Sequence, residues 1–421
     1  MHLLAAGLNH HSAPLEIREK LALGKEQFQE AMGALAERVE QGMLLSTCNR
    51  TEVYVAGAAA PPMGTLWEYL SSLSGLSAAE LEPYVYVHTR DEAVRHLFRV
   101  SAGLDSMVIG EFEVLGQVRR ALEQAEHLKL LPMPLRRLFK DAVRVGRRVR
   151  SETAISQDAA SLSSVAVSLA RKLFGDLRGR KALVVSAGEA GELALEAVIK
   201  AGAFDVAITS RFHDKAERLA NLLGGRAIPY DQLEAGMAEA DLVITSSYAP
   251  HFLVRPAMVK QALAQRPQRP LLLIDIAVPR VIDPEVAEVH GVHLHDLDDL
   301  KDLCETNRAR RHGEAEKASA IVEDEVVRFT KWWDSLEVVP TIVALREGAE
   351  SVRKAKLART LPRLHSLSEE DRASIEAMTR SLVDKLLHVP ISYVKGNGDV
   401  ARRAEIVRQV FKLEEKGDPS P

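Results

Sequence analysis

Two reactive side chains, Cys48 and Arg50, stand between two apolar runs in the segment LLSTCNRTEVY. A cysteine thiolate is a strong nucleophile, and an acyl group held on sulfur accepts hydride more readily than an oxygen ester does. The ordinary thiol pKa is about 8.5, so a reactive Cys48 needs a positive charge or a base nearby. Arg50 is the first candidate for that charge, and it is equally suited to hold a substrate carboxylate. The alternative is a cysteine that is simply buried.

A candidate base follows in the segment TRDEAVRHLFRVSAGLDSMVIGE. His96 is the obvious imidazole there, because histidine exchanges protons near neutral pH. By sequence spacing alone, the favoured interpretation is that His96 is a packed or surface histidine without a chemical role. The pairs His10–His11 and His293–His295 lack a matching set of carboxylates or thiolates. We therefore predict no metal site.

A glycine loop predicts a dinucleotide site further along the chain. The loop reads SAGEAG between an apolar strand and a helix, where such a site usually has G-x-G-x-x-G. Gly188 would let the backbone approach the pyrophosphate, and Gly191 would let the helix pack closely. Ser186 replaces the first glycine, and we expect its β-carbon to resist the tight turn. A Rossmann-like sheet that binds no nucleotide is the alternative.

Basic residues follow the next predicted strand. Arg211 stands where a site for NAD would place an acid, and Lys215 and Arg218 come soon after it. Basic side chains at this position suit a 2′-phosphate, so the predicted cofactor is NADPH. The predicted cofactor-binding residues are Ser186, Ala187, Gly188, Glu189, Ala190, Gly191, Ser210 and Arg211.

Three regions are expected to position these groups, which makes an α/β multidomain protein. Residues 1–153 alternate strands and helices in the order of a ferredoxin-like α+β sandwich, with Cys48 between two adjacent strands. Residues 154–292 contain continuous apolar strands separated by helices, which predicts a doubly wound, Rossmann-like parallel sheet. Residues 293–421 are charged and helical, and the run 304–333 predicts a long helix. These helices pair with a second subunit or pack back on the same chain.

Composition limits the class of protein. With 421 residues, 46% hydrophobic and 27% charged, the chain has an ordinary globular composition and is too long for one core. Its two cysteines are far apart, and no apolar stretch reaches the roughly 18 residues of a membrane span. We predict a cytoplasmic protein without membrane contact. The net charge of -4 argues against a general polyanion binder. The basic run 136–150 predicts either a phosphate-binding helix or a face neutralised by acids elsewhere.

The chain resembles the glutamyl-tRNA reductase family over nearly its whole length. The resemblance rests on GLNHHSAPLEIREKLA, LLSTCNRTEVY, HLFRVSAGLDSMVIGEFEVLGQVRRA, SAGEAGEL, IDIAVPRVIDPEV and LHDLDDL, in this order. It implies an NADPH-dependent oxidoreductase that converts glutamyl-tRNA(Glu) to glutamate-1-semialdehyde and releases tRNA. This reaction is the first step of tetrapyrrole (porphyrin) biosynthesis by the C5 pathway.

The resemblance also implies roles for individual residues. Cys48 would be the nucleophile that carries the glutamyl thioester, and His96 would be the histidine needed for activity. Arg50 would hold the side-chain carboxylate of the substrate. Glu113 departs from the glutamine usual in the family. The substrate-binding residues implied are Thr47, Cys48, Asn49, Arg50, Ser106, Glu111, Phe112, Glu113 and Gln117.

For the fold, the resemblance implies a catalytic domain, an NADPH domain and a long spinal helix leading to a helical dimerisation domain. The expected partners are glutamyl-tRNA(Glu), a second subunit in a V-shaped homodimer, and glutamate-1-semialdehyde aminomutase for product transfer. The basic run 136–150 is then a candidate tRNA contact. Two alternatives remain: a shikimate-dehydrogenase-like enzyme that acts on a small molecule, and a binding protein that has lost hydride transfer.

Overall fold

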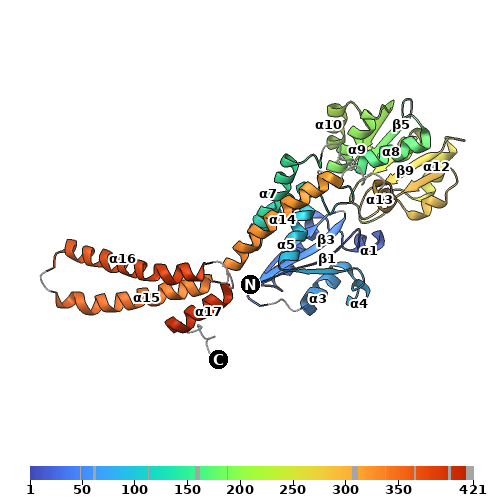
Figure 1. The fold of residues 1–421 in the computed structure, drawn as a ribbon. Coiled ribbons are helices and arrows are strands. Elements are labelled where there is room, and N and C mark those ends of the chain that lie inside the picture. The colour runs from blue at the N-terminus through green and yellow to red at the C-terminus, as the bar shows by residue number, and fades with distance from the viewer. Residues whose placement is uncertain are drawn as a thin grey trace. The chain divides into compact units, whose positions relative to one another are not determined.

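The computed structural model forms two compact units, residues 2–326 and residues 327–421 together with Met1. It describes residues 1–47, 49–59, 63–111, 113–156, 162–186, 188–305, 312–336, 338–364, 367–396 and 400–413. The first unit contains two β-sheets, and the second unit is built of helices (Figure 1). Within the described ranges, no helix has the length and apolar character needed to cross a membrane.

The N-terminal sheet is antiparallel, with strand order β2-β3-β1-β4. Its strands are β1 (His2–Asn9), β2 (Gln41–Ser46), β3 (Arg50–Gly57) and β4 (Tyr86–Thr89). The helices between them are α1 (Leu15–Lys20), α2 (Lys25–Ala36), α3 (Met63–Ser74) and α4 (Ala78–Leu81). This order is the ferredoxin-like arrangement expected from the sequence, so that prediction is confirmed. The connection between β2 and β3 contains Cys48.

Three helices follow β4 and complete the N-terminal domain: α5 (Asp91–Ser101), α6 (Glu113–His127) and α7 (Leu135–Glu152). The apolar side chains of α5, including Val94, Leu97 and Phe98, are buried. Because residues three and four apart share one face of a helix, His96 and Arg99 lie together on a more polar face. The helix thus fixes the direction in which His96 points.

The second sheet is entirely parallel, with strand order β10-β9-β8-β5-β6-β7. Its strands are β5 (Lys181–Val185), β6 (Asp205–Thr209), β7 (Arg226–Ala227), β8 (Leu242–Thr245), β9 (Leu271–Asp275) and β10 (Val292–His295). Its helices are α8 (Leu162–Phe174), α9 (Glu189–Lys200), α10 (His213–Leu223), α11 (Leu233–Glu239), α12 (Pro256–Ala264) and α13 (Leu297–Glu305), with short 3-10 helices η1 (Tyr230–Gln232) and η2 (Pro284–Glu288). Separate apolar clusters cover the two faces of this sheet. The order is that of a Rossmann fold, with its switch point between β5 and β8.

The structure corrects one boundary of this domain. The predicted limit at residue 292 falls inside β10, which pairs with β9 along its whole length. In β10, Val292 and Leu294 alternate with His293 and His295. A half-polar edge strand lacks the continuous apolar run by which the other strands were recognised, and the two-residue β7 is too short to show one.

The C-terminal helices are α14 (His312–Ser335), α15 (Val339–Thr360), α16 (Glu369–Val394) and α17 (Val400–Phe411), with the 3-10 helix η4 (Leu361–Arg363). Helices α15 and α16 run side by side (Figure 1) around a small apolar core that includes Leu345 and Leu387. Other apolar side chains of α16, such as Leu386 and Val389, remain exposed. The all-α prediction is confirmed. Of the run 304–333, residues 306–311 lie outside the described residues.

Candidate active site

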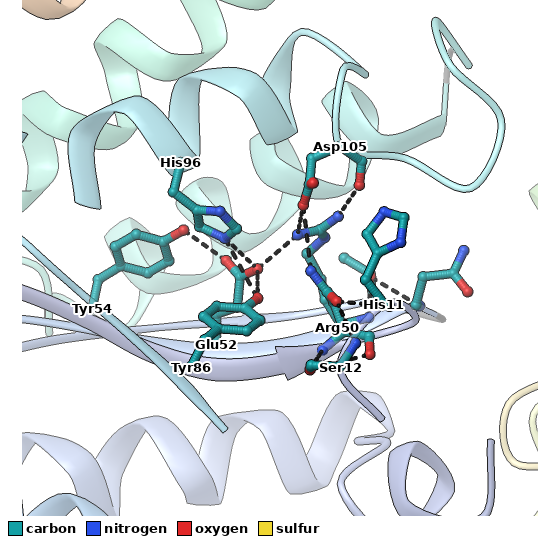
Figure 2. Close-up of polar contacts among 11 residues, drawn as sticks. His11, Ser12, Arg50, Glu52, Tyr54, Tyr86, His96 and Asp105 are labelled. Carbon is teal, nitrogen blue, oxygen red and sulfur yellow. Dashed lines mark hydrogen bonds and ion pairs between the residues drawn. The ribbon is translucent and has the colours of Figure 1, made fainter. Parts of the chain in front are cut away.

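A buried carboxylate, Glu52, organises the centre of the N-terminal domain (Figure 2). The Glu52 side chain is 0% exposed and accepts hydrogen bonds from Arg50 Nη1 at 2.7 Å and His96 Nε2 at 2.8 Å. The hydroxyl groups of Tyr54 and Tyr86 each donate to it at 2.6 Å. Burial opposes ionisation, but His96 and Arg50 outweigh it and hold the pKa of Glu52 well below its usual value. Glu52 is therefore an ionised carboxylate with four donors.

Strand geometry explains how these groups meet. Arg50, Glu52 and Tyr54 alternate along β3, so their side chains emerge on one face of the sheet. Across the sheet, Gly7 of β1 lies between Glu52 and Tyr86 in register. A β-carbon at Gly7 would lie 2.9 Å from Glu52 Cγ and 2.4 Å from the carbonyl oxygen of Thr51. Only glycine leaves room here for the Tyr86 hydroxyl to reach the carboxylate across β1.

The contact with Glu52 sets the chemistry of His96. A carboxylate accepts hydrogen bonds only, so the bond assigns the proton of the neutral imidazole to Nε2 and leaves a lone pair on Nδ1. Nδ1 makes no hydrogen bond to any described residue, and the His96 side chain is 11% exposed. An imidazole held in this way can take a proton at Nδ1, and Glu52 would stabilise the resulting positive charge.

A hollow of about 590 Å³ opens beside His96. Its wall includes His11 and Ser12 after β1, Tyr86 and His88 on β4, and Asp105 after α5. The rings of His88 and His96 lie 4.8 Å apart between centroids. Burial, followed by the neighbouring His96, lowers the pKa of His88 and favours its neutral form. His96 therefore faces a space that is bordered by polar and charged residues and is large enough for part of a substrate.

Arg50, the predicted contact for the substrate carboxylate, is engaged in ion pairs inside the protein. Its side chain is 1% exposed, and Nη1 bonds to Glu52 and, at 3.0 Å, to Asp105 Oδ2. Nη2 donates to the backbone oxygen of Asp105. Burial lowers the pKa of Arg50, but Glu52 and the other neighbouring acidic groups raise it by more. The net shift of the Arg50 pKa is therefore upward. In this structure Arg50 ties β3 to the segment after α5, and its contact with a substrate carboxylate stays a prediction.

The TCNR connection is a tight turn between β2 and β3. Thr47 N donates to the carbonyl oxygen of Arg50 at 2.8 Å, and Thr47 Oγ1 accepts from the backbone N–H groups of Asn49 and Arg50. Asn49 is buried, and its Oδ1 accepts from Arg18. Thr47 and Gln117 border a second hollow of about 250 Å³. Cys48 itself lies outside the described residues, as do Phe112 and Ala187.

Two carboxyl groups, those of Glu111 and Glu113, lie at the predicted substrate-binding turn, where α6 begins. Burial first, and then the nearby Glu113, raise the pKa of Glu111 to about 7. Burial, followed by Glu189, also raises the pKa of Glu113, although Arg120 opposes the shift. Ser106 is buried in the same region. The departure at Glu113 therefore places at this turn a second carboxyl whose pKa is raised.

The glycine loop fits a dinucleotide. A β-carbon at Gly191 would lie 2.8 Å from Ser186 Cβ, so helix α9 can approach the strand only with glycine there. Ser186 does not adopt a positive φ, and its Oγ accepts from the backbone N–H of Gly188 at 3.2 Å. The expected conflict at Ser186 is therefore absent: the hydroxyl closes the turn. Ala190 packs against the core beneath the loop, and Glu189 pairs with Arg120 at 2.5 Å.

Comparisons with known proteins cover the whole chain. Residues 6–153 match the family model described as Glutamyl-tRNAGlu reductase, N-terminal domain, and residues 317–413 match the dimerisation domain of the same family. A glutamyl-tRNA reductase from Syntrophotalea carbinolica is 42% identical, over 98% of this chain and 95% of that protein. One from Geobacter sulfurreducens is 40% identical, over 98% of this chain and 97% of the relative. This chain belongs to the glutamyl-tRNA reductase family.

A solved structure of the glutamyl-tRNA reductase from Methanopyrus kandleri supports the same assignment. It is 32% identical with a TM-score of 0.52, and the match covers 98% of this chain and 99% of that one. Residues 168–303 match the Shikimate / quinate 5-dehydrogenase model, so a dehydrogenase-like dinucleotide domain is present. That match ends before the C-terminal helices and begins after the catalytic domain. The small-molecule dehydrogenase alternative therefore explains only the middle of this reductase-family chain.

The predicted 2′-phosphate residues lie at the carboxyl end of β6. Arg211 is exposed, and its Nη2 donates to the backbone oxygen of Tyr248 at 3.3 Å. Ser210 Oγ accepts from the N–H of Phe212, and Lys215 Nζ lies 4.9 Å from the centre of the Phe212 ring. This side of the sheet is where Rossmann domains bind dinucleotides, and no acid occupies the ribose position. The geometry fits the NADPH dependence of the family.

The basic helix α7 is largely neutralised. Glu325 of α14 has a side chain that is 1% exposed, and it pairs with Arg144 at 2.7 Å and with Arg148 at 2.8 Å. Arg136 and Lys140 both pair with Glu126. The interpretation that acidic residues elsewhere in the fold neutralise this helix face is thus supported for much of the run 136–150. As a tRNA contact, the run 136–150 stays a prediction.

Glu52, Tyr86 and Asp105 were not among the site residues predicted from the sequence. A signal for Glu52 was present, because an acid two positions after Arg50 interrupts an otherwise apolar strand. Alternation along the strand then places both charged side chains on one buried face, where each charge must be paired to be stable. Asp105 and Tyr86 had no such local signal, since their partners lie on other elements.

Proposed function

We propose that this chain is a glutamyl-tRNA reductase that converts glutamyl-tRNA(Glu) to glutamate-1-semialdehyde, the first step of tetrapyrrole formation by the C5 pathway. Family membership over the full chain is the observation that carries this function. The Glu52–His96 pair beside a polar hollow supports it, because acyl transfer to a thiol needs a positioned proton carrier.

The first step joins the glutamyl group to Cys48. The thiol proton passes to His96 Nδ1, and Cys48 sulfur attacks the ester carbonyl. The bond from that carbon to the 3′ oxygen of tRNA then breaks, and His96 returns the proton to this oxygen. Glu52 stabilises the imidazolium between the two transfers, much as the carboxylate does in other triads. The products are free tRNA and a glutamyl thioester on Cys48.

The second step releases the aldehyde. NADPH, when bound at the glycine loop, supplies the hydride for the thioester carbon. The carbon–sulfur bond then breaks, Cys48 leaves as a thiolate, and a proton from solvent restores the thiol for the next turnover. Gly188 and Gly191 shape the loop for the pyrophosphate, and Arg211 is placed for the 2′-phosphate.

Further partners follow from the same assignment. The match to a dimerisation domain supports a homodimer, and exposed apolar side chains on α16 offer it a surface. Product transfer to glutamate-1-semialdehyde aminomutase and the cytoplasmic location stay predictions. The alternative of a binding protein without hydride transfer loses its one support, because Ser186 stabilises the loop.

The function is tested with purified protein, glutamyl-tRNA(Glu) and NADPH. We expect one aldehyde and one free tRNA for each NADPH oxidised, measured by absorbance of the cofactor and trapping of the aldehyde. Free glutamate and 3-dehydroshikimate, the ketone that a shikimate dehydrogenase reduces, serve as controls and should oxidise no NADPH. Equal oxidation with either control, or none with glutamyl-tRNA, would refute the proposal.

A substitution of Arg211 tests the cofactor. Arg211→Gln should weaken NADPH binding by roughly tenfold while leaving NADH binding unchanged, because one charge-assisted contact to phosphate is lost at an exposed site. Fluorescence titration measures both affinities. Arg178→Gln is the matched control, since Arg178 is an exposed arginine that precedes β5, away from the carboxyl ends of the strands. Unchanged NADPH affinity in Arg211→Gln would contradict the assignment.

A further inference from the structure

The glycine loop of the dinucleotide domain has acidic neighbours. Glu189 and Glu192 lie in the first turn of α9, the helix that follows the loop. Burial, and after it the charge of Glu189, raises the pKa of Glu113 at the start of α6, so these two carboxyl groups lie close together. A dinucleotide adds the negative charges of its pyrophosphate at the N-terminus of this helix. A cation near the loop would therefore favour binding there.

Arg120 of α6 is a cation at this place. Its Nη1 pairs with Glu189 Oε2 at 2.5 Å. Within the described ranges, no other lysine or arginine forms an ion pair with the loop or with the first turn of α9. A β-carbon at Gly116 would lie 3.6 Å from Arg120 Nη1 and 3.9 Å from Glu189 Oε1. The loop thus meets the N-terminal domain at this ion pair, over Gly116.

The guanidinium of Arg120 has donors left for a second anion. An arginine carries five N–H donors in a planar fork, which matches phosphate oxygens as well as carboxylates. Arg120 makes no other hydrogen bond or ion pair to the described residues. Its side chain is 44% exposed, so an anion from solvent has access to it. The same arginine can therefore keep Glu189 and donate to a phosphate oxygen.

The position of Arg120 also joins the cofactor loop to predicted substrate residues. Arg120 follows Gln117 by three residues on α6, so the two side chains share one face of the helix. Both border the hollow of about 250 Å³ whose wall includes Thr47. A cofactor in contact with Arg120 is thereby held against the domain that carries the thiol of the proposed reaction.

We propose that Arg120 of the N-terminal domain belongs to the NADPH site and donates to the pyrophosphate at the glycine loop. Glu189 holds the guanidinium beside the loop, and a residue from outside the dinucleotide domain completes the site. This inference rests on the dinucleotide site and goes beyond the proposed function, whose cofactor residues all lie in the dinucleotide domain.

The test measures ligand affinity of the full chain by fluorescence titration with NADPH. Arg120→Gln should weaken NADPH binding by about tenfold, because a charge-assisted contact to phosphate is lost at a partly exposed site. Adenosine 2′-monophosphate has the 2′-phosphate but no pyrophosphate, and its affinity is measured by displacement of NADPH. It should bind Arg120→Gln as tightly as wild type, whereas Arg211→Gln should weaken both ligands.

The neighbouring arginine provides the matched control. Arg119 is exposed and pairs with Glu123 on the same helix at 3.6 Å, away from the loop. Arg119→Gln should leave the affinities for NADPH and for adenosine 2′-monophosphate within about twofold of wild type. Arg120→Lys keeps the charge and should retain more NADPH affinity than Arg120→Gln. Thermal melting identifies the conditions under which every variant is folded.

A double variant separates contact from simple neutralisation. If Arg120 only cancels the charge of Glu189, Arg120→Gln should cost no NADPH affinity once Glu189→Gln has removed that charge. Direct contact with the pyrophosphate predicts that Arg120→Gln still weakens NADPH binding by at least about threefold in the Glu189→Gln background.

Three results would overturn the proposal. They are an unchanged NADPH affinity in Arg120→Gln, equal losses for NADPH and adenosine 2′-monophosphate, and a loss that disappears in the Glu189→Gln background. A wild-type protein that binds no NADPH would overturn it as well. If the wild-type protein binds NADPH with the expected differences among the variants but reduces no glutamyl-tRNA, only the proposed function fails.

Discussion

Cys48→Ser is expected to abolish formation of glutamate-1-semialdehyde, with a loss of at least about 10³-fold in kcat. A serine hydroxyl is a far weaker nucleophile at neutral pH, and any ester it formed would accept hydride poorly. The measurement uses glutamyl-tRNA labelled in the glutamate and follows the label on protein and in aldehyde. Wild-type protein without NADPH should hold the label as a thioester, and added NADPH should move it into aldehyde.

The other cysteine of the chain provides the control. Cys304→Ser should leave both the thioester and the aldehyde unchanged, because Cys304 belongs to α13, outside the predicted catalytic domain. Aldehyde formation by Cys48→Ser at the wild-type rate would exclude a thioester intermediate at this position. If the label remains on tRNA with wild-type protein, the TCNR segment has only a structural role. The hypothesis of a binding protein that has lost hydride transfer would then be favoured.

Glu52→Gln is expected to lower kcat by about 100-fold, the upper range for losing the group that orients a functional histidine. The amide is neutral, so it no longer stabilises His96 once the ring is protonated. Its NH2 group must also face one of the four donors that now point at the carboxylate. KM should change little, because Glu52 is buried and does not reach the hollow. Steady-state kinetics with glutamyl-tRNA separate the two constants.

Tyr54→Phe is the matched control for Glu52→Gln. It removes another hydrogen bond to the same carboxylate, at Oε2, and leaves the bond from His96 in place. We expect a stability loss of about 1 kcal/mol and a kcat within a few-fold of wild type. Thermal melting identifies the temperature range in which both variants are folded. A normal kcat for folded Glu52→Gln would contradict the role of Glu52 in positioning His96.

Such a buried charge cluster is costly unless it is complete. Removing one partner of a buried pair typically costs about 3–5 kcal/mol, because the remaining charge has no water to solvate it. Each member therefore constrains the others, and the His96 ring is held by the same bonds that satisfy Glu52. The cluster exchanges some stability for a fixed imidazole orientation.

Local patterns in the sequence determined much of the architecture. Alternating and continuous apolar runs marked most strands of both sheets, and their order indicated the ferredoxin-like and doubly wound folds. These patterns work because burial of a strand or a helix face depends on neighbours a few residues away. The half-polar edge strand β10 was missed for the same reason, since its pairing with β9 is what makes it a strand.

The chemistry-bearing residue types were also readable from the sequence: a cysteine in TCNR, a histidine in the next helical segment, and a glycine loop followed by Arg211. Spacing and resemblance suffice for these, because each role depends on the residue type and its immediate context. The sequence by itself therefore determined the family and the cofactor class, and it supplied the thiol and the imidazole of the proposed first step.

Only the tertiary structure decided which charged side chains pair with one another. Glu52 meets His96 across 44 positions of the chain, and Arg50 meets Asp105 across 55. No local pattern reports such a meeting, because it exists only once β1, β3 and β4 pair and α5 packs on them. That packing encloses Arg50 in an ion cluster with Glu52 and Asp105 and fixes the direction of the His96 ring. The residue types could thus be read from the sequence, but their partners could not.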